Sequence, residues 1–257
     1  MDFELTAIPA FRDNYIWLLS QGRAAVVVDP GDATPVRDAL SRRQLRLEAI
    51  LITHHHSDHA GGAAELAAEH HCPVYGPANE QIPAVTHPLR EGAECLVPAL
   101  GAAHFDILDI PGHTAGHIAY CGHNIVFCGD TLFSAGCGRL FEGTAAQMAA
   151  SLGKLASLDE QTQVCCGHEY TQANLRFAAA VEPGNPRILA YAEEVKALRE
   201  AGKPTLPSRI GLERQVNPFL RCGEPTVAAA ASRRAAGPVA DPVEVFAVIR
   251  SWKDNFT

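Results

Sequence analysis

Short runs of apolar residues that end in turn-forming residues fill most of the first 170 positions of the chain. A run of this length, bounded by Gly, Pro, Asn or Asp, is typical of a buried β-strand. The pattern predicts strands at residues 3–8, 15–19, 24–28, 49–53, 105–110, 118–121, 124–128 and 163–166. Between these strands, the alanine-rich segment 63–71 and residues 144–158 have the pattern of helices.

Two of the helices are predicted to begin at residues that favour helix starts. Thr34 precedes Pro35, so we expect Thr34 to be the N-cap and Pro35 the first helical residue. Thr144 is expected to cap the helix that follows it, because a threonine side chain can accept a hydrogen bond from the first free backbone N–H groups.

The pattern changes after about residue 170, where helical segments replace strands. We expect helices at residues 171–181, 186–201 and 242–256, connected through the proline-containing segments 203–207 and 217–219. These helices are amphipathic and need a surface to cover. The sequence therefore predicts two domains, a larger one over residues 1–170 and an all-helical one over residues 171–257.

Composition limits the number of domains and the expected cellular location of the protein. The 257 residues are 47% hydrophobic, which suffices for one large domain or for a main domain with a smaller one. No apolar stretch approaches the roughly 20 residues of a membrane span. The N-terminus is acidic and lacks the features of a secretory signal, so we expect a cytoplasmic protein without a membrane partner.

Charge and cysteine content argue against two classes of protein, nucleic-acid-binding proteins and disulfide-stabilised ones. The formal net charge is −8, and no basic stripe is present to neutralise phosphates, which argues against nucleic acid as a partner. The eight cysteines include no C-x-x-C pair. We therefore expect reduced, mostly buried thiols and no disulfide framework. No exposed apolar helix face stands out, and we expect a monomer.

The segment from Thr53 to His59 has the most specific chemistry in the chain. It places His54, His56, Asp58 and His59 directly after a predicted strand. Imidazole nitrogens and a carboxylate suit zinc, iron or manganese, and four such groups without a thiolate favour a catalytic site over a structural one. A solvated polar loop is the alternative, but the regular spacing and the following Gly61 and Gly62 argue against it.

Three further candidate ligands follow other predicted strands. His113, Asp130 and His168 each come directly after a glycine, which lets the backbone approach a site closely. Taken singly, each is more often a turn residue. Beside the His54–His59 segment, they become candidate metal ligands.

This order of motifs resembles the metallo-β-lactamase superfamily: His-x-His-x-Asp-His, then a histidine, an aspartate and a last histidine. Within it, the chain resembles the glyoxalase II (hydroxyacylglutathione hydrolase) family over nearly its whole length. The segments that carry the resemblance are 13–17, 28–31, 53–59, 111–117, 129–133, 135–139, 166–170 and 217–221.

The resemblance implies an α/β fold, namely a four-layer αββα sandwich with a C-terminal all-helical domain that binds substrate. It also implies two divalent metal ions, zinc or else iron or manganese, with a bridging hydroxide. One ion would be bound by His54, His56 and His113, the other by Asp58, His59 and His168, and both by Asp130. Asp58 would orient the hydroxide that attacks a thioester carbonyl and would accept its proton.

The substrate that the family implies is S-D-lactoylglutathione, hydrolysed to D-lactate and glutathione in methylglyoxal detoxification. Arg250 and Lys253 share a helix face and match family positions that bind the glycine carboxylate of glutathione. Arg139, Phe141 and Tyr170 also match binding positions. Arg139 stands where lysine is common, which keeps the charge but changes its geometry, and Phe141 stands where some members have tyrosine, which removes one hydroxyl contact.

Three rival interpretations remain open at this stage. The first is a mononuclear iron persulfide dioxygenase on the same fold, although the C-terminal extension with Arg250 and Lys253 weighs against it. The second is another hydrolase of the superfamily, such as a lactonase, a nuclease or a β-lactamase. The third is a metal-holding protein without catalytic activity.

Overall fold

The computed structural model describes residues 3–101 and 103–256, and the chain forms two compact units. Unit 1 consists of Met1–Asp109, Thr114–Gly129 and Cys165–His168. Unit 2 consists of Ile110–His113, Asp130–Val164 and Glu169–Thr257. The chain therefore passes from one unit to the other several times, and each unit is described by itself.

The first sheet of unit 1 has six strands in sequence order. They are β1 (Glu4–Ala10), β2 (Asn14–Gln21), β3 (Ala24–Val28), β4 (Arg46–Leu51), β5 (Val74–Pro77) and β6 (His87–Leu89). The first three strands are antiparallel, because short turns join them. From β3 onward the pairing is parallel, because α1 (Ala33–Arg43) and α3 (Ala63–His70) provide the crossover connections.

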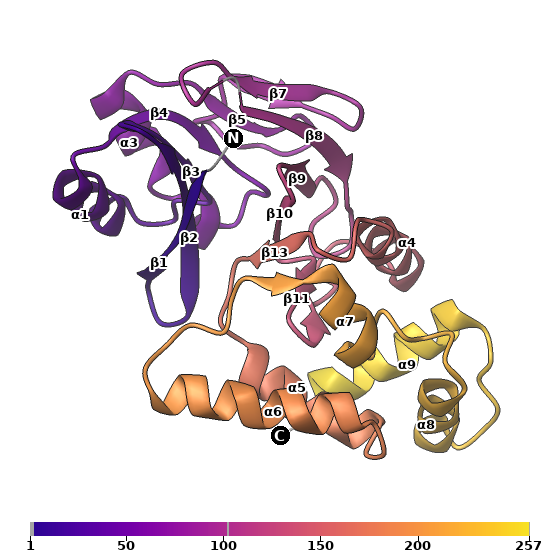
Figure 1. Ribbon diagram of the computed structural model, residues 1–257. Helices are drawn as coiled ribbons and strands as arrows, with labels where there is room; N and C mark the ends of the chain where they lie inside the picture. The colour runs from indigo at the N-terminus through magenta and orange to yellow at the C-terminus, as the bar shows by residue number, and fades with distance from the viewer. Residues whose placement is uncertain (1–2, 102, 257) are drawn as a thin grey trace. The chain divides into compact units, whose positions relative to one another are not determined.

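The two crossover helices cover one face of this sheet (Figure 1). Val36 of α1 and Leu66 of α3 are fully buried in one core cluster with side chains of the sheet. Leu18, Val27 and Ile50 are sheet residues of this cluster. The other face of the sheet is buried as well, so that β2 is apolar on both sides and almost entirely buried.

The second sheet has the order β14-β13-β10-β9-β8-β7. Its strands are β7 (Glu94–Val97), β8 (Ala103–Asp109), β9 (Ile118–Gly122), β10 (Ile125–Gly129), β13 (Gln163–Cys166) and β14 (Ser208–Arg209). The two sheets are connected within unit 1 by buried side chains. Trp17 Nε1 donates to the Cys166 carbonyl at 2.9 Å, and Tyr120 Oη donates to the Ile52 carbonyl at 3.0 Å.

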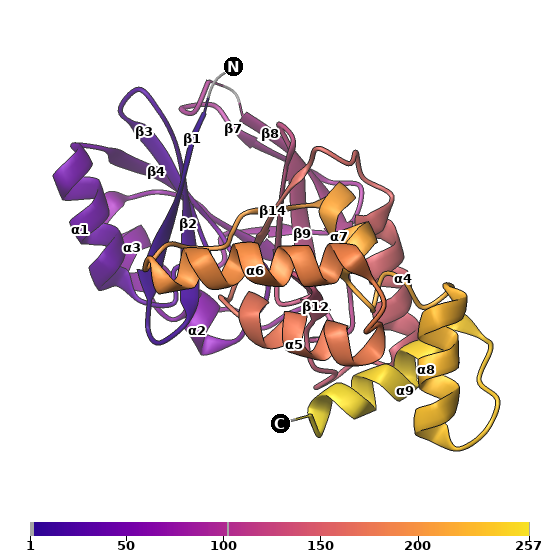
Figure 2. The same ribbon diagram turned by 60° about the horizontal axis from the view of Figure 1, so that its bottom comes forward.

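Unit 2 is mainly helical. Its elements include the hairpin of β11 (Leu132–Phe133) and β12 (Gly136–Cys137), and the helices α4 (Ala145–Ala156), α5 (Thr171–Val181), α6 (Pro186–Glu200), α7 (Ile210–Val216), α8 (Pro225–Ala235) and α9 (Pro242–Asp254). Helices α5 and α6 run side by side (Figure 2). Leu175, Ile188, Val195 and Val216 form their shared core.

Most of the predicted elements are confirmed, with ends that differ by a few residues. Thr144 caps α4 in a capping box with Gln147, as predicted. The predicted N-cap at Thr34 is wrong, because α1 begins at Ala33 and Asp32 caps it. The Asp32 carboxylate accepts the Thr34 backbone N–H at 2.8 Å, and a negative charge is favoured at a helix N-terminus. The domain boundary predicted near residue 170 differs from the compact units, which also place Asp130–Val164 with the C-terminal helices.

None of the helices in the described ranges is long and apolar enough to cross a membrane. All eight cysteines are free thiols, and all except the half-buried Cys72 are buried. Burial raises the pKa of Cys72 to about 11 and the pKa values of Cys95, Cys121 and Cys222 to about 12. The expectation of buried, unlinked thiols is confirmed.

Candidate metal centre

The parallel strands β3 and β4 bring the first polar residues of the site to one edge of the sheet. Asp29 follows β3, and the segment that contains His54 follows β4 and leads into the short helix α2 (Ser57–Ala60). Neighbouring parallel strands end at the same edge, so residues distant in sequence become neighbours. This edge holds most of the predicted metal ligands.

Asp29 fixes the conformation of the histidine-rich segment. Its two carboxylate oxygens accept hydrogen bonds from Thr53 N at 2.8 Å and from Thr53 Oγ1 at 2.7 Å. Oδ2 also lies 3.0 Å from Nδ1 of His59. A carboxylate at Nδ1 favours the tautomer in which Nε2 can bind a metal. Asp29 thus orients the His59 ring through its Nδ1 atom.

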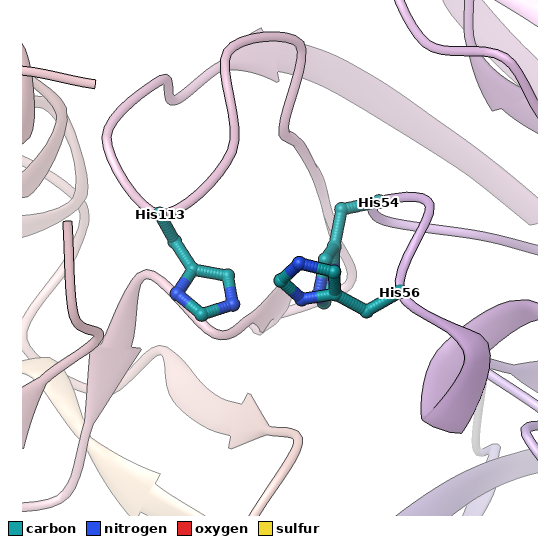
Figure 3. Close-up of side chains that lie close together, drawn as sticks. All are labelled: His54, His56 and His113. Atoms are coloured by element: carbon teal, nitrogen blue, oxygen red, sulfur yellow. The ribbon is translucent and has the colours of Figure 1, made fainter. Parts of the chain in front are cut away.

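His54 and His56 present their rings to each other. Nε2 of His54 lies 3.1 Å from Nδ1 of His56, and Nδ1 of His54 lies 3.0 Å from Thr53 Oγ1. Figure 3 draws both side chains, which leave the chain in the segment between β4 and α2. The fully buried His117 stacks on His54 with ring centroids 4.5 Å apart. These contacts with Thr53, His56 and His117 hold the His54 ring in place.

Asp58, His59 and His168 form a second cluster in unit 1. One donor atom of each lies within 4.8 Å of the donor atoms of the other two. Oδ2 of Asp58 is 3.6 Å from Nε2 of His59 and 3.5 Å from Nε2 of His168. Asp29, His54 and His59 form another group within the same limit. Unit 1 alone therefore collects five of the seven predicted ligands: His54, His56, Asp58, His59 and His168.

Two neighbouring residues support this cluster, Asp13 just before β2 and Asn14 as its first residue. Asp13 Oδ1 lies 2.9 Å from Nδ1 of His168, and Asn14 Nδ2 donates to Asp58 Oδ2 at 2.9 Å. These contacts repeat for His168 what Asp29 provides for His59. Asp13 and Asn14 belong to the family-like segment 13–17, but their sequence pattern alone indicated no role for them.

Gly31 permits the close packing of the site. A Cβ atom at Gly31 would lie 1.9 Å from the carbonyl oxygen of Asp58, which no side chain could tolerate. The loop after β3 therefore lies directly against the start of α2, which carries Asp58. Any larger residue at this position would displace the ligand loop.

His55 is directed to a different partner than its neighbours. Its Nδ1 atom lies 3.0 Å from Oε2 of Glu80, whose side chain is only 3% exposed. Thr114 Oγ1 donates to the other oxygen of Glu80. Glu80 thus connects the His54–His59 segment to the loop that follows His113. No signal in the sequence pointed to Glu80.

In unit 2, His113 and Asp130 lie next to each other. His113, the third side chain of Figure 3, comes from the loop after β8, and Asp130 follows β10. Nε2 of His113 is 3.5 Å from Oδ2 of Asp130, and its Nδ1 is 2.9 Å from the Arg139 carbonyl oxygen. Both side chains are at least 92% covered, since their exposed fractions are 5% and 8%. They are buried imidazole and carboxylate groups, which suit a metal site.

The predicted substrate residues all belong to unit 2, and three of them are exposed. Phe141 is 62% exposed and lies 5.1 Å from the His113 ring, centroid to centroid. The side chain of Arg139 is 66% exposed. Tyr170 is 36% exposed and packs edge-on against Phe133 at 5.2 Å. These side chains are accessible to a ligand.

Arg250 and Lys253 of α9 are less accessible than the sequence suggested. Arg250 is 5% exposed, and its Nη1 donates to the Cys137 carbonyl at 2.8 Å. Lys253 Nζ donates to the Ala173 carbonyl at 3.2 Å. Burial, followed by repulsion from Arg250 and Arg176, lowers the pKa of Lys253 to about 8. Both cations are thus held in place by backbone carbonyls.

The fold and the donor groups define the class of protein. Residues 10–168 match the model of the metallo-β-lactamase superfamily, and the chain belongs to this superfamily and has its fold. The predicted fold class is thereby confirmed. The crystal structure of TTHA1623 in a di-iron-bound form is similar, with 26% identity and a TM-score of 0.59, and the match covers 84% of this chain and 100% of that one. Together with the clustered histidine and aspartate side chains, membership of this superfamily indicates a site for divalent metal ions.

The C-terminal helices and the sequence relatives specify the family further. Residues 169–256 match the model described as hydroxyacylglutathione hydrolase C-terminus. The hydroxyacylglutathione hydrolase of Nitrosomonas europaea is 53% identical, with 97% of this chain and 95% of the relative covered. That of Alkalilimnicola ehrlichii is 57% identical, with 98% and 99% covered. The chain therefore belongs to the hydroxyacylglutathione hydrolase family, and the expected family is confirmed.

Proposed function

We propose that this protein hydrolyses the thioester S-D-lactoylglutathione to D-lactate and glutathione, the second step of methylglyoxal detoxification. The observation that carries the proposal is the cluster of Asp58, His59 and His168 in a chain whose full-length relatives are named hydroxyacylglutathione hydrolase. The cluster provides a carboxylate beside metal-binding imidazoles. The family membership favours this reaction over the persulfide dioxygenase alternative.

The donor set fits two divalent ions. We assign His54, His56 and His113 to one ion, Asp58, His59 and His168 to the other, and Asp130 to both. The support is chemical: nitrogen and oxygen donors without a thiolate suit zinc, iron or manganese, and an open catalytic site uses such mixed sets. Of these we favour zinc, with iron or manganese as alternatives. The related TTHA1623 has been crystallised with two irons.

Such ions, when bound, lower the pKa of a water molecule and polarise a carbonyl oxygen. In our proposal Asp58 orients the attacking water and takes its proton on a carboxylate oxygen. The hydrogen bond from Asn14 Nδ2 to Asp58 Oδ2, 2.9 Å long, keeps the carboxylate in one orientation. A C–O bond forms at the thioester carbon, the C–S bond breaks, and the thiolate of glutathione leaves with both bonding electrons. Since thiolates are good leaving groups, no separate general acid is needed.

We assign recognition of the glutathione part to Arg139, Phe141, Tyr170, Arg250 and Lys253. Glutathione has two carboxylates, and the three cations among these residues suit them. The exposed ring of Phe141 offers an apolar surface but no hydroxyl group. We further propose that the enzyme acts as a monomer in the cytoplasm, since one chain contains all assigned residues and free thiols suit a reducing compartment.

The test is hydrolysis of S-D-lactoylglutathione by the metal-loaded enzyme and by the variants Asp58→Asn and Asp38→Asn. Asp58→Asn is expected to lower kcat by about 100- to 10,000-fold, the usual contribution of general acid–base catalysis. Asp38 is exposed on α1 and serves as the charge-matched control. Absence of hydrolysis by the metal-loaded wild type would refute the proposal. One iron per chain together with oxygen uptake on glutathione persulfide would establish the dioxygenase instead.

A further inference from the structure

Asp254 lies between two of the arginines that we assign to the substrate. It is the last residue of α9, and its Oδ1 atom accepts a hydrogen bond from Arg250 Nη2 at 2.9 Å. The same oxygen is 3.8 Å from Nε of Arg139. The Asp254 side chain is 41% exposed, so its carboxylate faces solvent on one side and the two guanidinium groups on the other.

An acidic residue is disfavoured at the C-terminal end of a helix such as α9 unless a nearby cation compensates its charge. The C-terminal end of a helix carries partial negative charge and repels carboxylates. Two cations approach the Asp254 carboxylate, since Arg250 Nη2 donates to it and Nε of Arg139 lies 3.8 Å away. These contacts favour a carboxylate at a helix end that would otherwise disfavour it.

Arg250 cannot be reached by an anion while its present contacts remain. It is 5% exposed, its Nη1 is bonded to the Cys137 carbonyl, and Nη2 is bonded to Asp254. The Cys137 contact belongs to the backbone of a hairpin, whereas Asp254 is a half-exposed side chain at a helix end. Asp254 is the contact that an incoming carboxylate can replace.

We propose that Asp254 occupies the position of a substrate carboxylate between Arg139 and Arg250, and that its displacement sets the affinity for the glutathione part of the substrate. The inference rests on the proposed function and identifies a specificity-determining residue within it. Two carboxylates repel each other at one site, so binding of a carboxylate-bearing thiol must move Asp254 away. A thioester whose thiol part is uncharged does not have to displace it.

The variant Asp254→Asn tests this, because it keeps the shape and removes the competing charge. We expect the KM for S-D-lactoylglutathione to fall by about three- to tenfold, the range of a partly exposed ion pair, with kcat little changed. The dissociation constant of S-methylglutathione, measured by calorimetry, is expected to fall in parallel. The kcat/KM for S-lactoyl-N-acetylcysteamine, whose thiol part is uncharged, should stay as in the wild type. Glu244→Gln, exposed on the same helix, is the charge-matched control and should change none of these values.

An unchanged or raised KM and dissociation constant in Asp254→Asn would overturn the inference, since Asp254 would then be irrelevant or would orient the arginines for substrate. An equal rise in kcat/KM for S-lactoyl-N-acetylcysteamine in Asp254→Asn would also overturn the inference. The calorimetric measurement does not depend on turnover. If the wild type fails to hydrolyse lactoylglutathione but Asp254→Asn binds S-methylglutathione more tightly than the wild type does, the proposed function fails and the inference stands. If neither the wild type nor Asp254→Asn binds S-methylglutathione, the inference fails as well.

Discussion

Lys253 combines a buried position with a proposed role in binding the anionic substrate. Its ammonium group lies 5.3 Å from the centroid of the Phe177 ring and donates to the Ala173 carbonyl. Burial and the charges of Arg250 and Arg176 lower its pKa to about 8, so the cation is lost as the pH rises through that value. Binding of an anionic substrate by Lys253 is therefore sensitive to pH in the mildly alkaline range.

We predict that the kcat/KM for S-D-lactoylglutathione falls above about pH 8, because this ratio reports groups of the free enzyme. One pH unit above the pKa, roughly a tenth of the molecules keep the charge. In Lys253→Met this fall should be absent, and kcat/KM should already be low at neutral pH. Lys196→Met, exposed on α6, is the control, and the uncatalysed hydrolysis is subtracted. Identical pH profiles for wild type and Lys253→Met would contradict the prediction.

At the residue scale, the sequence pointed to the candidate metal ligands more clearly than to the residues that hydrogen-bond to them and to their neighbours. The His54–His59 segment stands out because its donors are close in sequence. Asp13 and Glu80 could not be given a role, because each meets its partner only through long-range contacts, with His168 and with His55 and Thr114. The burial of Arg250 was missed for the same reason, since the Cys137 carbonyl is 113 positions away.

At the element scale, α7 holds the β11–β12 hairpin in place. The fully buried Glu213 of α7 accepts hydrogen bonds from Ser134 Oγ at 2.9 Å and from the Ala135 N–H at 2.7 Å, at the turn of the hairpin. Burial raises the pKa of Glu213. Asn217, just after α7, donates to the carbonyls of Phe133 and Gly136. Since the Cys137 carbonyl of the same hairpin binds Arg250, α7 also positions the substrate site indirectly.

We predict that Glu213→Ala lowers the free energy of unfolding by about 3 kcal/mol, because several buried donors lose their acceptor. Urea denaturation followed by circular dichroism measures this change. The KM for lactoylglutathione should rise as well, since Arg250 loses its fixed contact. Glu193→Ala on the exposed side of α6 should leave both values unchanged. If the free energy of unfolding falls no further in Glu213→Ala than in Glu193→Ala, then α7 does not hold the hairpin in place.

The elements that the sequence pattern missed are short or lack a distinct period. Strands β5, β6 and β7 have three or four residues each, and β6 and β7 are edge strands with one partner each. Helix α8 begins with Pro225 and is rich in alanine, so a helix-start signal was present but was not used. Where the helical segment was long, as in α5 with 11 residues and α6 with 15, the prediction was confirmed.

At the scale of the whole molecule, the proposed ligands stand where the chain crosses between the two units. Crossings fall directly after His113, before Asp130 and after His168. Five of the proposed ligands belong to unit 1, and two belong to unit 2. In the proposed assignment the ions bind only to the folded chain, so the free energy of metal binding adds to the stability of the native state.

We predict that removal of the metals with a chelator lowers the midpoint of thermal unfolding by roughly 5 to 10 °C, as expected for ligands present at about 100 times their dissociation constants. Adding zinc back should restore the midpoint, whereas magnesium should not, because imidazole-rich sites disfavour it. The variant His113→Ala should be less sensitive to the chelator. Scanning calorimetry measures each midpoint, and an unchanged midpoint after complete metal removal would contradict the proposed stabilisation by bound metal.

The buried cysteines have a consequence for an enzyme that releases a thiol at every turnover. Mixed disulfides form when a protein thiolate attacks an oxidised partner, and only the thiolate is reactive. The half-buried Cys72, with its pKa near 11, stays almost fully protonated at neutral pH, and the other cysteines are covered by the protein. The thiols of this enzyme are therefore poor targets for mixed-disulfide formation with oxidised glutathione, which accumulates under oxidative stress.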